Sequence, residues 1–97
     1  MISSSIIQRE YNRFYKEVRK YIWGFQAVEA LADLEISVYR RIPDMFEIQD
    51  NLNKFRQYSK EVELDDEEFV KAADRLQDLL DENEEPYAKL YEVREVL

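Results

Sequence analysis

LDDEEFVKAADRLQDLL, residues 64–80, has a complete helix pattern from its cap to its last leucine. Asp65 followed three residues later by Glu68 matches a capping box, and Leu64 with Phe69 matches the hydrophobic staple that accompanies one. Apolar residues then recur three or four positions apart and predict one buried stripe: Phe69, Ala72, Ala73, Leu76, Leu79 and Leu80. We expect this helix to end in the polar run 81–85.

Two more capping boxes predict helices nearer the N-terminus. Ser5 with Gln8 begins the first, and Asp44 with Glu47 begins another. Their apolar stripes are, in order, Ile7, Tyr11, Phe14, Val18, Tyr21 and Phe25, and then Met45, Ile48, Leu52, Phe55 and Val62. Gly24 either ends the first helix in a left-handed cap or marks a bend through which the helix continues.

The segments before Pro43 and after Pro86 complete the predicted fold. The first has helical spacing in Val28, Leu31, Ala32, Ile36, Tyr39 and Ile42, although the β-branched run at 36–42 is also compatible with a strand. Pro86 favours the first turn of a short last helix with Tyr87, Leu90, Tyr91 and Val93 or Val96. We expect an all-α protein with a single domain over residues 1–97, an antiparallel bundle of four main helices plus a short C-terminal helix.

The composition agrees with a folded helical protein without a catalytic centre. Hydrophobic residues make up 45% of the chain, and one Gly with two Pro leave few of the tight turns that sandwiches and barrels need. With no Cys and no His, the chain lacks thiol nucleophiles, zinc ligand sets and His-based general catalysts, so we expect a non-enzyme without metal or cofactor. We find no signal peptide or membrane-spanning segment and expect a cytoplasmic protein.

Negative charge is concentrated in the last part of the chain. Residues 1–60 carry ten Lys or Arg against eight Asp or Glu, whereas residues 61–97 carry four against fourteen, so the net charge changes from +2 to −10. Helical spacing predicts one acidic stripe opposite the apolar one, made of Glu67, Asp74, Asp78, Asp81 and Glu85. Like charges at this spacing repel, so folding does not require the stripe. The alternative is a solvated face that favours solubility.

The predicted first helix has the opposite charge on the face away from its apolar stripe. Its cations are Arg9, Arg13, Lys16 and Lys20. No Gly-rich loop or helix-turn-helix pattern accompanies them, and a net charge of −8 repels a polyanion, so we expect no direct nucleic-acid binding. We expect the cations to be solvated or to pair with acids such as Glu10 and Glu17.

A localised acidic face is typical of proteins that bind basic clefts. An enzyme that holds nucleic acid presents Lys and Arg, and a helix with carboxylates about 5 to 6 Å apart can occupy the phosphate positions. Complementary charge speeds association, whereas tight binding also needs buried anchors. Tyr58, Tyr87 and Tyr91 lie near the acidic segments and are candidate anchors, with core packing as the alternative for each.

Residues 67–76, EEFVKAADRL, resemble the acidic helix of the colicin D immunity protein family, and residues 89–94, KLYEVR, resemble its C-terminal stretch. The resemblance implies a helical immunity protein of the bacteriocin or contact-dependent growth inhibition type, bound to a tRNA-cleaving toxin whose tRNA phosphates the acids replace. It gives Asp74 the central acidic role, with Asp78 and Asp81 as neighbours and Arg75 in a structural role. The chain differs from that family in its longer first helix and in the turn after Leu80.

The leading hypothesis is an acidic, antitoxin-like immunity protein that neutralises a basic toxin nuclease and is a monomer or weak homodimer outside the complex. Its predicted partner-binding residues are Tyr58, Glu63, Asp66, Glu67, Asp74, Asp78, Asp81, Glu82, Glu85, Tyr87 and Tyr91. One alternative is a structural or adaptor protein that self-associates or joins a larger assembly through its aromatic stripes, in a salt-resistant way. The other is a phage inhibitor that mimics DNA.

Overall fold

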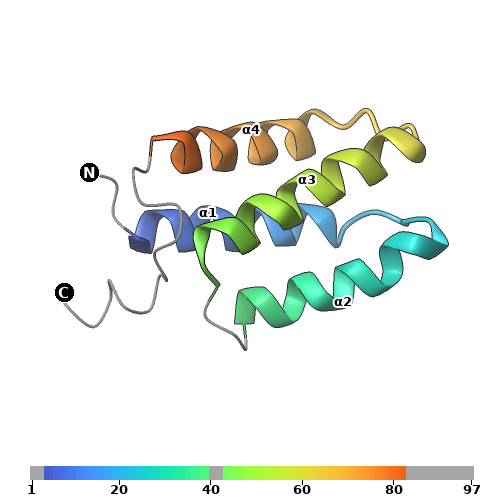
Figure 1. Cartoon of the computed structure of the whole chain (residues 1–97). Coiled ribbons are helices and arrows are strands. Elements are labelled where there is room, and N and C mark those ends of the chain that lie inside the picture. Colours follow the sequence, from blue (N-terminus) through green and yellow to red (C-terminus); the bar gives the residue numbers. More distant parts are fainter. Residues whose placement is uncertain (1–3, 40–42, 83–97) are drawn as a thin grey trace.

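Four helices follow one another along the chain. The structure, a computed structural model, describes residues 4–39 and 43–82, and within them it contains no strand and four helices: α1 (Ser4–Val18), α2 (Phe25–Tyr39), α3 (Met45–Glu61) and α4 (Glu67–Asp81). The helices run alternately in opposite directions, which confirms the predicted antiparallel bundle (Figure 1). The strand alternative is wrong for residues 36–39, which are helical, and the predicted helix after Pro86 lies outside the described residues.

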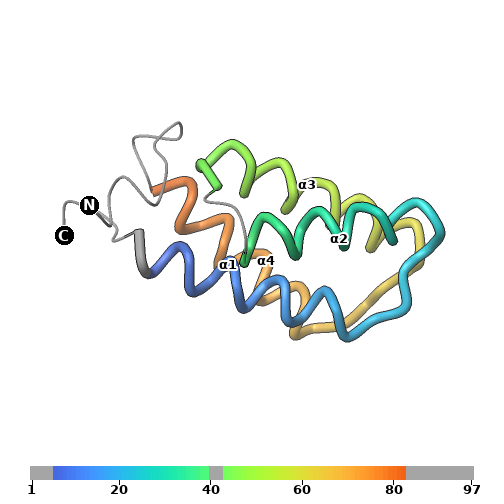
Figure 2. The backbone as a smooth tube through the Cα atoms, turned by 90° about the horizontal axis from the view of Figure 1, so that it is seen from below, coloured from blue at the N-terminus to red at the C-terminus, as the bar shows by residue number. Residues whose placement is uncertain are grey.

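The helices form a closed ring around the core. α1 packs against both α2 and α4, and α3 packs against the same two helices from the other side (Figure 2). α2 and α4 therefore lie at opposite corners of the bundle, at the bottom and top of Figure 1. Their outer faces point away from each other, which separates any surfaces that they carry.

Aspartate caps begin α3 and α4. The predicted cap of α3 is confirmed, because Oδ1 of Asp44 accepts a hydrogen bond from the backbone N–H of Glu47 at 2.8 Å. The predicted cap of α4 is wrong by one residue: Asp66, not Asp65, accepts from the N–H groups of Glu68 at 2.8 Å and Phe69 at 3.3 Å. Two adjacent aspartates carry the same capping group, so only the turn geometry distinguishes them.

Leu64 packs against the core from the turn before α4, but as a partly buried residue two positions before Asp66. It is therefore outside the position that a staple uses, which is directly before the cap. The turn itself needs a left-handed backbone at Glu63, whose φ is 54°. Leu64 thus contacts the core as predicted, but it does not occupy the predicted staple position.

α1 ends earlier than the sequence predicts. It begins at Ser4, so Ser5 lies inside the helix instead of capping it, and it ends at Val18. The indole N–H of Trp23 donates to the carbonyl of Val18 at 2.7 Å and satisfies one of the acceptors that a helix end leaves free. Gly24 has no positive φ, so the predicted left-handed cap is absent, and Phe25 is 95% exposed instead of lying in the core.

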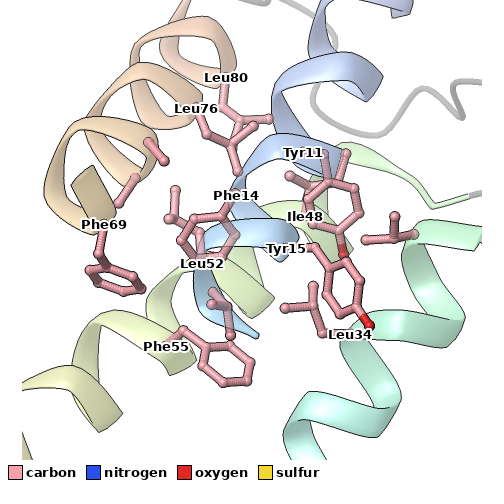
Figure 3. Packing of buried hydrophobic residues seen from close by; sticks show 14 of the residues in the cluster. Tyr11, Phe14, Tyr15, Leu34, Ile48, Leu52, Phe55, Phe69, Leu76 and Leu80 are labelled. Atoms are coloured by element: carbon pink, nitrogen blue, oxygen red, sulfur yellow. The ribbon is translucent and has the colours of Figure 1, made fainter. Parts of the chain in front are cut away.

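One hydrophobic cluster draws side chains from all four helices (Figure 3). The predicted stripes of α1, α3 and α4 are confirmed by burial of Ile7, Tyr11, Phe14, Val18, Met45, Ile48, Leu52, Phe55, Phe69, Ala72, Ala73, Leu76 and Leu80. Rings meet across the bundle, as where Phe14 and Phe69 lie 5.8 Å apart. Burial of each large apolar side chain stabilises the fold by about 1.5 to 3 kcal/mol. Two predicted members are exposed, Phe25 and Val62, the C-cap of α3, and two more are partly buried, Tyr21 and Leu79.

The predicted inner face of α2 is wrong. Of the predicted stripe, Leu31 is partly buried, Ile42 lies outside the described residues, and the exposed members are Val28, Ala32, Ile36 and Tyr39. The helix instead buries Ala27, Leu34, Ser37 and Val38. α2 is apolar on both sides, so periodicity alone cannot tell which side faces the core.

Polar side chains fix the packing of the helices. The hydroxyl of Tyr11 lies 2.7 Å from Oγ of Ser37 on α2 and accepts from Nδ2 of Asn51 on α3 at 2.7 Å. The amides of Gln49 and Gln77 donate to each other at 2.7 and 2.8 Å and join α3 to α4. Buried or partly buried hydrogen bonds of this kind specify one arrangement of the helices, because an unpaired polar group would be costly.

Candidate functional site

The acidic face of α4 points away from the core. It consists of four exposed residues: Glu67, Asp74, Asp78 and Asp81. Phe69 and Leu76 lie on the opposite side of the helix and are buried, so the predicted stripe projects into solvent. Glu82, the C-cap of α4, is exposed and extends the face, whereas Glu85 lies outside the described residues. α4 thus presents carboxylates over its whole length.

Two members of the acidic face pair with cations of this chain. Oδ1 of Asp74 lies 2.9 Å from Nη2 of Arg56 on α3, and Oε1 of Glu67 lies 3.3 Å from Nζ of Lys71. Both carboxylates are well exposed, and pairs of this kind stabilise a protein by less than about 1 kcal/mol. These two pairs lower the local charge without withdrawing the carboxylates from solvent.

The C-terminal end of the acidic face has the least compensated charge. Asp78 and Asp81 form no ion pair within residues 4–39 and 43–82, and Oδ1 of Asp81 accepts one hydrogen bond from Nε2 of Gln77 at 2.9 Å. The negative end of the helix dipole lies at the same place, so these acids add to it instead of offsetting it. A cationic partner would relieve that repulsion.

The other predicted site residues have different surroundings. Glu63 is exposed in the turn before α4. Tyr58 is half-buried, with its ring 5.5 Å from that of Phe55, so core packing accounts for much of its surface. Tyr87 and Tyr91 lie outside the described residues. Of the three candidate anchors, only Tyr58 can therefore be placed, and it lies beside the α2–α3 edge of the bundle.

Asp66, a predicted partner-binding residue, also makes contacts within the fold. Besides capping α4, its carboxylate accepts a hydrogen bond from Tyr21, which together with the two backbone N–H groups holds the pKa of Asp66 below its usual value. Burial and the same hydrogen bond raise the pKa of Tyr21 to about 12. The carboxylate stays charged while it makes these contacts, and its role in partner binding stays a prediction.

The basic row of α1 lies along a shallow hollow of about 550 Å³. Its four cations, Arg9, Arg13, Lys16 and Lys20, are all exposed, as predicted. Acids of the same helix lie among them: Nζ of Lys20 is 2.8 Å from Glu17, and this hydrogen bond raises the pKa of Lys20. The predicted pairing with Glu10 and Glu17 is confirmed.

Glu10 is a buried charged residue, and its burial was not predicted from the sequence. It is 1% exposed, and its oxygens lie 3.0 Å from Nε of Arg75, 3.5 Å from Arg13 and 3.7 Å from Arg9. The angles are not those of regular hydrogen bonds, so the guanidinium groups stabilise the carboxylate mainly by charge. The pattern that points to it is Arg13 three residues later, at the spacing that brings two side chains together on a helix.

The described residues contain no cluster of three or more His, Cys, Asp or Glu side chains arranged to hold a metal ion. None of the described helices combines the length and the apolar character needed to cross a bilayer. No protein-family model, curated protein sequence or solved structure matches the chain.

Proposed function

We propose that this protein is a non-catalytic inhibitor of the immunity type, which binds a basic nucleic-acid-handling protein through the acidic face of α4. The observation that supports it best is the exposure of Glu67, Asp74, Asp78 and Asp81 on one side of one helix. In a cleft built for nucleic acid, these carboxylates would occupy phosphate positions and exclude the substrate by both charge and volume.

The rigid mounting of α4 supports this function. The Asp66 cap fixes its first turn, Arg75 joins it to Glu10 of α1, and Gln77 joins it to Gln49 of α3. Carboxylates held in place before binding lose little conformational entropy when a partner engages them. An acidic helix held in this way is a better phosphate substitute than a mobile acidic tail.

The resemblance to the colicin D immunity protein family narrows the proposal to a tRNA-cleaving toxin as the partner. The residues that carry the resemblance, 67–76, form most of α4. The structural role that the resemblance gives to Arg75 agrees with its ion pair to Glu10. Asp74, to which it gives the central role, is exposed and, among the described residues, pairs with the partly exposed Arg56, an interaction that a toxin arginine can replace.

A second candidate function is an adaptor that joins other proteins without inhibiting them. The observation that favours it is the exposed apolar side of α2, on which Phe25 is 95% and Val28 57% exposed. Surfaces of this kind on small proteins mark interaction sites. The two candidate functions make different predictions, because inhibition depends on α4 and adaptor binding depends on α2.

The test uses the product of the gene directly upstream, purified with and without this protein. The variant carries Asp78→Lys with Asp81→Lys, at the end of the acidic face whose carboxylates form no ion pair with the described residues. We expect the parent protein to co-purify with that product and to block cleavage of bulk tRNA, and the variant to bind at least about tenfold more weakly. Binding of the parent should weaken steeply with added salt.

The matched control carries Asp50→Lys with Asn53→Lys and Gln57→Lys, the same total change of charge on exposed positions of α3. We expect it to protect like the parent. Circular dichroism and thermal unfolding should show that both variants keep the fold. If the α4 variant protects as well as the parent, or if the upstream product has no nuclease activity, the proposed function is wrong.

A further inference from the structure

The outer side of α2 is an apolar surface that is largely exposed, although the ring of Tyr39 also packs edge-on against that of Tyr15 on α1, with the ring centroids 5.5 Å apart. We define the α2 stripe as its exposed apolar residues, which recur three or four positions apart: Phe25, Val28, Ala32, Ile36 and Tyr39. Phe25, Val28 and Tyr39 are more than half exposed, and Ile22 in the preceding turn is 96% exposed. Single exposed apolar residues are ordinary, but a continuous stripe along a whole helix is a feature of interaction sites.

The inner side of α2 attaches the helix to the rest of the bundle. Ala27, Leu34 and Val38 are buried against the core, and Ser37 hydrogen bonds to Tyr11. The helix is therefore held in place without the stripe. Apart from Tyr39, whose ring contacts Tyr15, its apolar outer residues expose hydrophobic surface to water, which indicates that they have another use.

The surface at the N-terminal end of the stripe is hollowed on both sides of Phe25. Phe25 stands between two hollows, one of about 230 Å³ next to Tyr58 and Val62 of α3, and one of about 530 Å³ next to Val28. Gly24 lies at the edge of the first hollow, where it adds no side chain. An apolar side chain from a partner can enter beside Phe25 and contact both α2 and α3.

Both edges of the stripe are acidic. Helical geometry places Glu29 and Asp33 along one edge and Glu35 along the other, and all three are exposed. α2 contains no Lys or Arg. Glu61 lines the first hollow and adds a further negative charge at that end. The stripe is thus an apolar strip framed by carboxylates.

This charge pattern selects among possible occupants. A second copy of α2 would bring acidic edges together in either helix orientation, and like charges in contact cost binding energy. The anionic surface of a membrane would be repelled for the same reason. The segment 83–97 has four Glu against one Lys and one Arg, so it does not match acidic edges either. A partner with basic edges matches them.

We propose that the α2 stripe is a docking site for an amphipathic helix of another protein, with its apolar face flanked by Lys and Arg. Apolar side chains of that helix pack on Ala32 and Ile36 and beside Phe25, while its cations meet the carboxylates on both edges. This is the helix-in-groove mode of recognition, in which residues three and four apart act as anchors. The 15 residues of α2 offer about 22 Å of contact length.

The α2 site is separate from the acidic face of α4 and does not rest on the proposed inhibitor function. The two helices occupy opposite corners of the bundle (Figure 1). A variant on one corner therefore leaves the side chains of the other unchanged. Failure of one proposal can be distinguished from failure of the other by using the two sets of variants in both experiments.

The probe is a synthetic helical peptide of the same length as α2, with a leucine stripe flanked by lysines. A second peptide replaces every lysine with glutamate. Binding to the full-length chain is measured by fluorescence anisotropy at physiological salt. We expect the lysine peptide to bind and the glutamate peptide to bind at least about tenfold more weakly. Val28→Gln with Ile36→Gln should weaken the lysine peptide by about tenfold or more.

Charge reversal at the edge tests the recognition directly. Glu29→Lys with Asp33→Lys should weaken the lysine peptide and strengthen the glutamate peptide, a swap of preference that loss of folding cannot produce. Val70→Gln on α4, also an exposed apolar position, and Asp78→Lys with Asp81→Lys are controls that should change binding by less than about threefold. Peptide binding that follows the α4 variants and ignores the α2 variants would overturn the proposal.

A photo-crosslinker placed at Ala32 in the full-length chain identifies the occupant. We expect a crosslink to the lysine peptide. A crosslink within the chain or between two copies that persists when the peptide is added, or binding to phosphatidylcholine vesicles in preference to the peptide, would show a different occupant and contradict the inference.

Discussion

Nε of Arg75 on α4 lies 3.0 Å from Oε1 of Glu10 on α1, and the glutamate is only 1% exposed. Arg9 and Arg13 lie at 3.7 and 3.5 Å from the same carboxylate. A buried carboxylate is costly unless cations neutralise it, so this cluster joins α4 to α1 at the contact that orients the acidic face. The arginines around Glu10 thus help to hold α4, and with it the acidic face, in position.

Replacement of Arg75 by Ala should lower the free energy of unfolding by about 1 to 3 kcal/mol, because it removes the nearest cation from a buried charge. The cost of breaking a fully buried pair is higher, but Arg75 is half exposed and two other arginines remain. Urea unfolding measures the loss. Arg9→Ala is the control and should cost less than about 1 kcal/mol. Equal losses would contradict the special role of Arg75.

Phe14 and Phe25, which belong to one predicted stripe, should respond oppositely to truncation. Phe14 is fully buried, so Phe14→Ala should cost about 3 to 5 kcal/mol of stability. Phe25 is 95% exposed, so Phe25→Ala should change stability by no more than about 0.5 kcal/mol. Thermal and urea unfolding give both values. A large loss of stability in Phe25→Ala would mean that the Phe25 ring packs in the core, as the sequence pattern predicted.

The cap of α3 gives a prediction that depends on a single oxygen. Asp44→Ala should destabilise the protein by about 1 kcal/mol, since the N–H of Glu47 loses its acceptor. Asp44→Asn keeps an acceptor oxygen in the same place and should cost much less. Hydrogen exchange at Glu47 should speed up in the Ala variant alone. Similar exchange in both variants would show that the cap is not needed.

Tyr21 predicts how stability changes in alkali. Its pKa is raised to about 12 in the folded protein from 10.0, first by burial and then by its hydrogen bond to Asp66. The stabilising effect is complete below pH 10.0 and is lost as pH rises toward 12, because the unfolded chain releases its proton first. The stability difference between the parent and Tyr21→Phe should therefore shrink over that range in urea unfolding. A constant difference would contradict the shift.

The spans and the buried faces of α3 and α4 could be predicted from the sequence because the cap signal, the apolar stripe and the polar face coincide, although the cap of α4 was placed one residue too early. Each has a capping aspartate, a stripe of large apolar residues on one side and polar residues on the other. The end of α1 could not be predicted, since the acceptor at Val18 is satisfied by Trp23, a side chain from beyond the helix. The inner face of α2 could not be predicted because Val28 and Ile36 are as apolar as the buried Leu34 and Val38.

The candidate site, too, could be predicted from the sequence only in part. Spacing alone placed Asp74, Asp78 and Asp81 on a common exposed face, since helical geometry fixes relative direction. Spacing did not reveal that Asp66 is occupied by Tyr21, because that contact joins residues far apart in the sequence. Most residues of the α2 stripe were predicted to face the core, and the structure shows that they are exposed instead. The α2 stripe could therefore be recognised as a surface only from the structure.

Consecutive residues of α1 hold the two opposite helices of the bundle. Glu10 pairs with Arg75 of α4, and the next residue, Tyr11, hydrogen bonds to Ser37 of α2. A ligand that shifts α4 would pull on the same turn of α1 that positions α2. If ligands occupy both helices in a ternary complex, each must alter the affinity of the other by the same factor, whether that factor favours or opposes joint occupancy.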